Sequence, residues 1–156
     1  MKSPENKLFE LHNFSLIQRA CDTCREFSRF SLISGPPGIG KTIGLTHYKD
    51  KNSEKVKYVR VRQSMHISHF LEELLNQYEL KKSYLKPNYH ALNAIKEFHE
   101  SCDEKYLLII DEGGKLKRNQ FGIIHELRDL TENKLGIIMS GPNYFVEKLK
   151  EWIDKD

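Results

Sequence analysis

The chain has 156 residues, of which 38% are hydrophobic and 30% are charged, and its formal net charge is +3. This length suits about one domain with a hydrophobic core, and so mild a charge excludes an inference of nucleic-acid binding from composition alone. The longest aliphatic run, Leu107 to Ile110, is too short to span a bilayer, and the N-terminus "MKSPENKLFE" lacks the apolar region of a secretory signal, so we expect a cytoplasmic protein.

Three cysteines, Cys21, Cys24 and Cys102, make an odd count that argues against a disulfide framework. The spacing of "CDTC" is compatible with metal or redox chemistry, but a structural zinc ion needs four ligands and no second pair of this kind follows. His66 and His69 also lack further ligands. We therefore interpret the cysteines as reduced, partly buried thiols.

Helices and strands are predicted to alternate along the chain. Apolar residues at three- and four-residue spacing indicate a first helix over residues 14–27, and the strand Phe30–Ser34 precedes a helix that begins at Lys41. A strand at 56–61 and a helix with Ser64 as its N-cap come next, followed by a connector at 81–87. The helix after the connector has an apolar face that carries Tyr89, Leu92, Ile95 and Phe98. The last four elements are a strand at 106–112, a helix at 121–130, a strand at 135–140 and a helix from Pro142 to near Trp152. This order predicts an α/β fold in which helices cover both faces of a parallel sheet, as one domain over residues 1–156.

The stretch "GPPGIGKT" lies between the first strand and the helix after it, and it matches the pattern G-x-x-x-x-G-K-[ST]. Glycines let the backbone N–H groups turn toward phosphate oxygens, and the following helix presents its positive end to the same anion. Lys41 is predicted to reach the β- and γ-phosphates, and the Thr42 hydroxyl to bind Mg²⁺. The alternative is a surface turn rich in glycine and proline. The predicted nucleotide-binding residues are Gly35, Pro36, Pro37, Gly38, Ile39, Gly40, Lys41, Thr42, Ile43 and Ser140.

The stretch "LLIIDE" places Asp111 at the carboxyl end of a buried strand, where open α/β sheets bind ligands. A carboxylate there is costly to desolvate unless a cation compensates it, so Asp111 is a candidate magnesium ligand. Glu112 is a candidate general base that activates a water for attack on the γ-phosphate. Ser140 ends the fourth strand, and its hydroxyl is either a γ-phosphate or water contact or an ordinary turn serine.

Together with "ACDTCREFSRF" and "HELRDLTENKLGIIMSGP", these motifs resemble the AAA+ ATPases, and within them the transposition helpers typified by phage Mu protein B. The resemblance covers residues 14 to 150. It implies that Gly35–Thr42 is the Walker A loop, that Asp111 and Glu112 are the Walker B pair, and that Ser140 is at the sensor-1 position. It also implies ATP and Mg²⁺ as cofactors, assembly into rings or filaments on double-stranded DNA, and a transposase or other recombination protein as partner.

The sequence departs from this family pattern at its end. "GGKL" follows the acidic pair, no arginine occurs after Arg128, and the chain stops at Asp156 after the helix that follows the fourth strand. The resemblance therefore implies a truncated AAA+ core, a P-loop NTPase sandwich without a lid domain. We expect strand order 1-4-3-2, an exposed first strand and weak ATPase activity.

Two groups of basic residues are candidates for contact with DNA phosphates. Lys115, Lys117 and Arg118 follow the predicted catalytic strand, and Arg60 and Arg62 alternate with valines on the second strand. Ordinary surface lysines and edge-strand charges are the alternative interpretations. The sequence of neither group distinguishes DNA contact from an ordinary charged surface.

Other functions stay open on the sequence alone. A small P-loop kinase would usually carry an arginine-rich lid, which the segment after Asp111 lacks. A GTPase is disfavoured because Gly136 stands where the guanine-reading Asn-Lys-x-Asp motif needs its aspartate. A nucleotide-binding interaction module with little turnover fits the same motifs as an ATPase.

Overall fold

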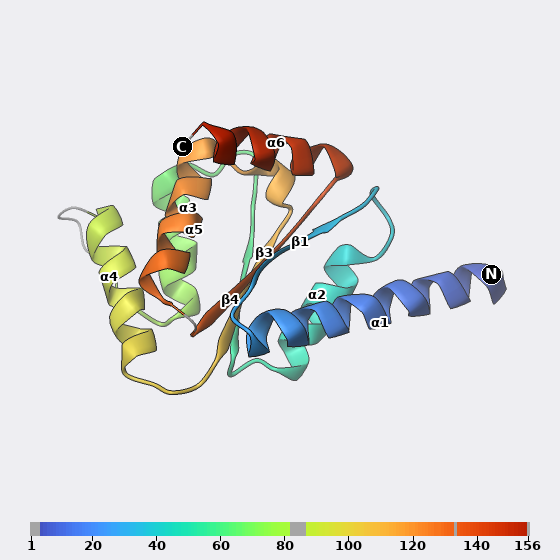
Figure 1. Ribbon diagram of the computed structural model, residues 1–156, viewed down its shortest axis with the longest axis horizontal. Coiled ribbons are helices and arrows are strands. Elements are labelled where there is room, and N and C mark those ends of the chain that lie inside the picture. The colour runs from blue at the N-terminus through green and yellow to red at the C-terminus, as the bar shows by residue number, and fades with distance from the viewer. Residues whose placement is uncertain (1–3, 82–86, 133, 156) are drawn as a thin grey trace.

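Four parallel strands form one sheet in the order β1-β4-β3-β2 (Figure 1). The structure is a computed structural model that describes residues 4–81, 87–132 and 134–155. The strands are β1 (Phe30–Ser34), β2 (Val56–Arg60), β3 (Tyr106–Asp111) and β4 (Leu135–Gly141). The predicted parallel sheet and its strand order are confirmed, including the position of β1 at one edge.

Helices cover both faces of this sheet, as the alternation of elements predicted. One face is covered by α1 (Pro4–Glu26) and α2 (Lys41–Lys51) (Figure 1). The other face is covered by α3 (Ile67–Gln77), α4 (Pro87–Glu100), α5 (Arg118–Leu130) and α6 (Asn143–Asp154). A short 3₁₀ helix, η1 (Gly113–Lys115), directly follows β3 at the carboxyl edge of the sheet.

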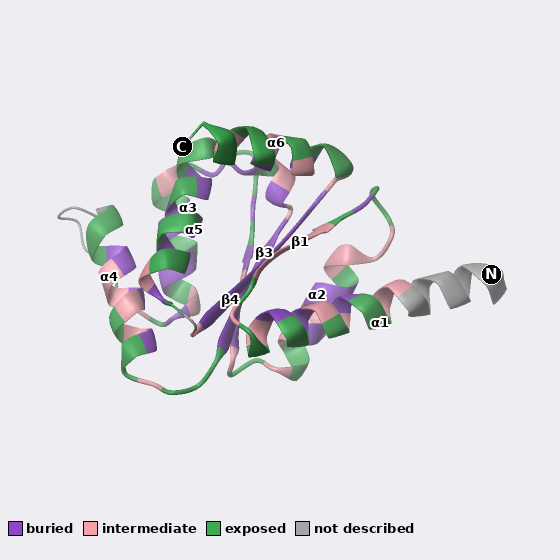
Figure 2. Ribbon diagram, in the orientation of Figure 1, coloured by how far each residue is buried: buried purple, intermediate pink, exposed green. Residues whose placement is uncertain are grey.

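The two central strands are buried along their whole length, shown in purple in Figure 2. Because successive side chains of a strand point to opposite faces, Leu107 and Ile109 join the core under α1 and α2, whereas Leu108 and Ile110 join the core under α3 to α6. Full burial of one such side chain stabilises the fold by roughly 1.5–3 kcal/mol. The apolar run "LLII" therefore fixes β3 in the middle of the sheet and holds the residues after it in place.

Several predicted helix starts were wrong. The first helix begins at Pro4 rather than at residue 14, and α5 begins at Arg118 rather than at residue 121. Ser64 does not cap α3, because the helix begins at Ile67 and His66 is its N-cap residue. The His66 backbone N–H donates to Nδ1 of His69 at 3.2 Å, so this histidine pair closes a helix end.

Other differences concern single positions. The prediction that Tyr89 belongs to the apolar face of α4 is wrong, because its side chain is 64% exposed and Ala91 is buried with Leu92 and Ile95 instead. The second strand ends at Arg60, so Arg62 lies beyond it. Residues 82–86 of the predicted connector lie outside the described residues. No helix in the described ranges is both long and apolar enough to cross a membrane.

At Gly136 the backbone of α1 packs directly against β4. A Cβ atom at this position would overlap the backbone carbonyl of Cys24, which cannot move without displacing the end of α1. Gly136→Ala is therefore expected to lower the free energy of unfolding by roughly 1–3 kcal/mol, measured by urea denaturation. The matched control is Gly122→Ala on α5, where a Cβ meets no atom within 4 Å and should stabilise the helix by up to about 1 kcal/mol. Equal effects of the two substitutions would contradict this packing argument.

Candidate nucleotide-binding site

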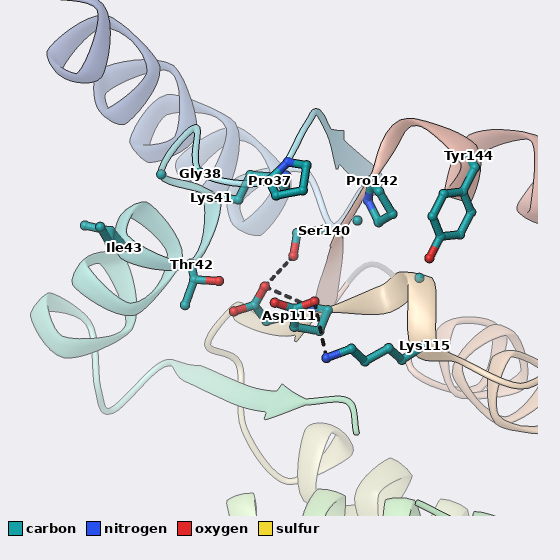
Figure 3. Close-up of a pocket in the computed structure, with 14 residues that line it drawn as sticks. Pro37, Gly38, Lys41, Thr42, Ile43, Asp111, Lys115, Ser140, Pro142 and Tyr144 are labelled. Atoms are coloured by element: carbon teal, nitrogen blue, oxygen red, sulfur yellow. Dashed lines mark hydrogen bonds and ion pairs between the residues drawn. The ribbon is translucent and has the colours of Figure 1, made fainter. Parts of the chain in front are cut away.

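A pocket of about 330 Å³ lies at the carboxyl edge of the sheet, between the Gly35–Thr42 loop and the ends of β3 and β4 (Figure 3). Most of the predicted site residues line it: Pro37, Gly38, Gly40, Lys41, Thr42, Ile43, Asp111, Glu112 and Ser140. Gly35, Pro36 and Ile39 are not among the lining residues. The pocket also contains residues to which the sequence analysis gave no nucleotide role: Gly114, Lys115, Gly141, Pro142 and Tyr144. Their position directly after β3 and β4 was the available signal.

The loop backbone takes the shape that its glycines permit. Gly38 and Gly40 have φ angles of 83° and 91°, in the left-handed region that other residues avoid. Gly35 donates its N–H to the carbonyl of Gly141 at 3.2 Å, which joins the start of the loop to the end of β4. Helix α2 begins at Lys41 and carries no acidic residue in its first turn, so its positive end stays available to an anion.

The Lys41 ammonium folds back onto its own loop. Its Nζ donates hydrogen bonds to the carbonyl oxygens of Gly35 at 2.6 Å and Pro36 at 2.9 Å. Partial burial lowers the pKa of Lys41, and the negative charges of Glu112 and Asp111 oppose that shift. No carboxylate forms a close ion pair with this amine among the described residues, so the charge is held by neutral carbonyls that phosphate oxygens can replace.

The Asp111 carboxylate accepts several hydrogen bonds from neighbouring strands, and the residue is only 1% exposed. Its Oδ1 accepts hydrogen bonds from the Ser140 hydroxyl at 2.6 Å and from the Glu112 N–H at 2.9 Å, and its Oδ2 accepts one from the Tyr58 hydroxyl at 2.6 Å. Burial raises the pKa of Asp111, but the hydrogen bonds from Ser140, Tyr58 and Thr42 outweigh burial and lower the pKa overall. The carboxylate is therefore ionised at neutral pH.

Ser140 lies inside β4 and is fully buried, so it is not an exposed turn serine. Figure 3 shows its hydroxyl meeting the Asp111 carboxylate, with Thr42 on another side of the same group. Ser140 thus ties the end of β4 to the end of β3. Its predicted contact with a γ-phosphate or a water stays a prediction.

Glu112 has an unusual backbone and an engaged side chain. Its φ angle is 57°, a left-handed conformation that costs a residue with a Cβ atom roughly 1–2 kcal/mol. The carboxylate forms ion pairs with Arg60 at 3.7 Å and Lys115 at 3.8 Å, and the side chain is 35% exposed. Glu112 therefore lies at the mouth of the pocket, where water can reach it.

The two glycines after Glu112 have a packing role that the sequence analysis did not find. A Cβ atom on Gly113 would lie 2.6 Å from the Phe145 ring and 2.8 Å from the Ser140 carbonyl, and one on Gly114 would lie 2.8 Å from Pro142. Lys148 of α6 donates to the carbonyl of Gly114 at 2.9 Å. Only glycine lets the loop after β3 pack this closely against the segment after β4.

The protein atoms in the pocket fit a magnesium nucleotide. Thr42 and Asp111 offer a hydroxyl and a carboxylate to the same pocket, and Mg²⁺ prefers such oxygen ligands together with substrate phosphates. Within the described ranges, no group of three or more His, Cys, Asp or Glu residues is arranged to hold a metal by itself.

The remaining candidate residues lie away from this pocket or have other contacts. Lys117 caps α5, and its Nζ donates to the Met65 carbonyl at 2.8 Å, so it is less available to DNA than predicted.

Cys21 and Cys24 are buried, and burial raises the pKa of their thiols to about 12 and about 11. Both are therefore protonated at neutral pH and poor metal ligands.

A family model described as "AAA domain" matches residues 25–149. Among solved structures, the chain is similar to Cdc6p from Pyrobaculum aerophilum, with 14% identity and a TM-score of 0.67 over 88% of this chain and 40% of that one. It is also similar to a chain of Drosophila ORC bound to DNA, with 13% identity and a TM-score of 0.58 over 88% of this chain and 39% of that one. No curated protein matches in the sequence comparison.

Identities this low show a shared fold and nothing further, and the chain spans only about two fifths of the length of these two structures. The family model matches residues 25–149, which include the Walker A loop, Asp111 at the end of β3, Glu112 directly after it, and Ser140. The predicted AAA+ fold is thereby confirmed, whereas no comparison points to the phage Mu protein B group. The match covers most of the chain, so the protein belongs to the AAA domain family of AAA+ ATPases.

Proposed function

We propose that this protein binds Mg-ATP in the Figure 3 pocket and hydrolyses it, and that the bound nucleotide controls its attachment to double-stranded DNA. The observation that carries the proposal is the convergence of the phosphate loop, the buried Asp111 and the end of β4 on one pocket. Family membership supports ATP binding and hydrolysis as the general activity. The DNA-linked role and the narrower role of transposition helper are our extension of it.

Each loop residue has a distinct proposed task in binding. Lys41 would exchange the carbonyls of Gly35 and Pro36 for β- and γ-phosphate oxygens, which form stronger, charge-assisted hydrogen bonds. Thr42 and Asp111 would hold Mg²⁺, which when bound neutralises charge on the phosphates. The N–H groups of the loop would hold the phosphate chain at the positive end of α2.

Hydrolysis needs a base near the γ-phosphate, and Glu112 is our candidate. The water oxygen would form a bond to the γ-phosphorus while Glu112 accepts the water proton, and the bond to the ADP oxygen would break. Ion pairs with Arg60 and Lys115 engage the Glu112 carboxylate in this structure. We therefore expect slow turnover until a partner or DNA draws these cations away.

The proposed DNA contact rests on cations near the same edge of the sheet. Arg60 and Arg62 line a groove of about 700 Å³ between β2 and α3, and Lys115 lies at the pocket mouth. Glu72 and Glu73 also line that groove, so we place phosphate contacts only at its arginine end. The Drosophila ORC structure that resembles this fold was solved bound to DNA, which agrees with the proposal.

The experiment is duplex-DNA binding with ATP, with ADP and without nucleotide, followed by fluorescence anisotropy at several salt concentrations. We expect tightest binding with ATP and a linear fall of log affinity with log salt. Arg62→Ala should reduce the slope of that line by about one, because one phosphate contact is lost. Lys96→Ala, on α4 at a distance from the groove, is the matched control. Equal affinity in all three nucleotide states would refute the DNA-linked function.

A second candidate function is a nucleotide-binding module without turnover, favoured by the ion pairs that engage Glu112. It predicts tight ATP binding with no phosphate release, whether DNA is present or not. Single-turnover hydrolysis with excess protein separates it from the first proposal, because even slow chemistry then becomes visible.

A further inference from the structure

Tyr58 is a polar contact of the site that neither the P-loop motif nor the acidic pair includes. It lies on the edge strand β2, and its hydroxyl donates to Asp111 Oδ2 at 2.6 Å. The residues with predicted roles contact the other oxygen, since Ser140 and the Glu112 N–H both donate to Oδ1. Tyr58 thus holds Oδ2 by a direct hydrogen bond from its hydroxyl.

The strand register brings this tyrosine to the site. In the β2–β3 pairing, Tyr58 is opposite Ile109 and Arg60 is opposite Asp111. Side chains two residues apart on a strand share a face, so Tyr58 and Asp111 lie on the same face of the sheet and the long phenol ring spans the step between them. That face carries α2, which also supplies Thr42.

Contacts along its whole length hold Tyr58 in this position. Its backbone N–H donates to Oε1 of Gln77 at 2.9 Å, which caps the outer edge of β2. The Lys49 ammonium lies 5.0 Å from the centre of its ring, and the ring packs against the core under α1 and α2. The hydroxyl is therefore placed by the backbone, the ring packing and the hydrogen bond together.

A carboxylate offers about four lone-pair positions, and Tyr58, Ser140 and the Glu112 N–H occupy three of them. The remaining position is on Oδ2, and Thr42 lines the same pocket as this carboxylate. Without the Tyr58 hydroxyl, the Asp111 carboxylate could rotate, and its oxygens would no longer be held in one orientation. Hydrogen-bond partners of this kind tune metal affinity by roughly 10- to 100-fold.

We infer that Tyr58 is a positioning residue that aims the Asp111 carboxylate at the magnesium ion of a bound nucleotide. This inference rests on the proposed function, because it requires a magnesium nucleotide in the pocket. It adds a residue of the edge strand to a site otherwise built from the P-loop, β3 and β4.

The test measures metal dependence rather than turnover. Binding of a fluorescent ATP analogue is titrated with MgCl₂, and separately measured in EDTA, for the wild type and Tyr58→Phe. We expect the magnesium concentration at half-maximal effect to rise about tenfold in the variant, with unchanged affinity in EDTA. Phenylalanine keeps the ring, so the fold should be retained, which circular dichroism checks.

The matched control is Tyr48→Phe. Tyr48 is a buried tyrosine of α2 whose hydroxyl donates to an aspartate, Asp22, at 2.8 Å, and it does not line the pocket. No shift in Tyr58→Phe, or an equal shift in both variants, would overturn the inference while leaving the nucleotide site intact. A wild type whose nucleotide binding ignores Mg²⁺ would overturn the proposed function as well.

Discussion

Glu112→Gln is expected to slow single-turnover ATP hydrolysis by roughly 10²- to 10⁴-fold, which is the usual contribution of a general base. Glutamine preserves the size and polarity of the side chain but cannot accept the proton of an attacking water. The ion pairs with Arg60 and Lys115 would also be lost, although exposed pairs of this kind contribute little to stability. ATP binding should therefore persist while phosphate release nearly stops.

The measurement uses protein in excess over radiolabelled ATP, with released phosphate followed over time. Glu126→Gln makes the same chemical change on an exposed turn of α5 and should behave as the wild type. Hydrolysis that proceeds at the wild-type rate in Glu112→Gln would assign the base to another residue. Hydrolysis undetectable in the wild type itself would favour the module without turnover.

Lys41→Ala is expected to weaken binding of the fluorescent ATP analogue by about 100-fold. Each hydrogen bond from a charged donor is worth roughly 1.5–3 kcal/mol, and the ammonium is proposed to reach two phosphates. Some of this energy is offset, because the bonds to Gly35 and Pro36 must break first. A net loss of about 2.7 kcal/mol corresponds to the stated factor.

Lys51→Ala is the matched control for this substitution. Lys51 ends the same helix, on which Lys41 is the first residue, so it tests for a general effect of positive charge on the anion. Anisotropy titrations at one fixed salt concentration compare the two. Similar losses in both variants would mean that bulk electrostatics, and not contact with the phosphates, governs binding.

Features set by local sequence could be predicted. The run "LLIID" is buried on both faces, and "GPPGIGKT" requires left-handed backbone at Gly38 and Gly40, so β3 and the phosphate loop follow from short stretches. The four-strand order could also be predicted, because the family resemblance implies it. The convergence of Asp111 and Ser140 then comes from the pairing of β3 with β4.

Features set by contacts across the chain could not be predicted. The Tyr58 hydroxyl meets Asp111 only through the register of β2 on β3, and the Gly113–Phe145 packing joins η1 after β3 to α6 after β4. The start of α3 failed for a different, local reason. His66 caps α3 through the ring of His69, whereas general cap preferences favour Ser64.

The left-handed backbone of Glu112 places stability and chemistry in opposition at a single position. Glycine adopts this conformation without a steric penalty, so glycine at position 112 would relieve the backbone strain of the turn after β3. Selection for a robust fold alone would thus tend to remove the carboxylate, and selection for turnover would tend to keep it. Under the proposed function, replacing Glu112 by glycine would therefore yield a more stable protein that binds nucleotide without hydrolysing it.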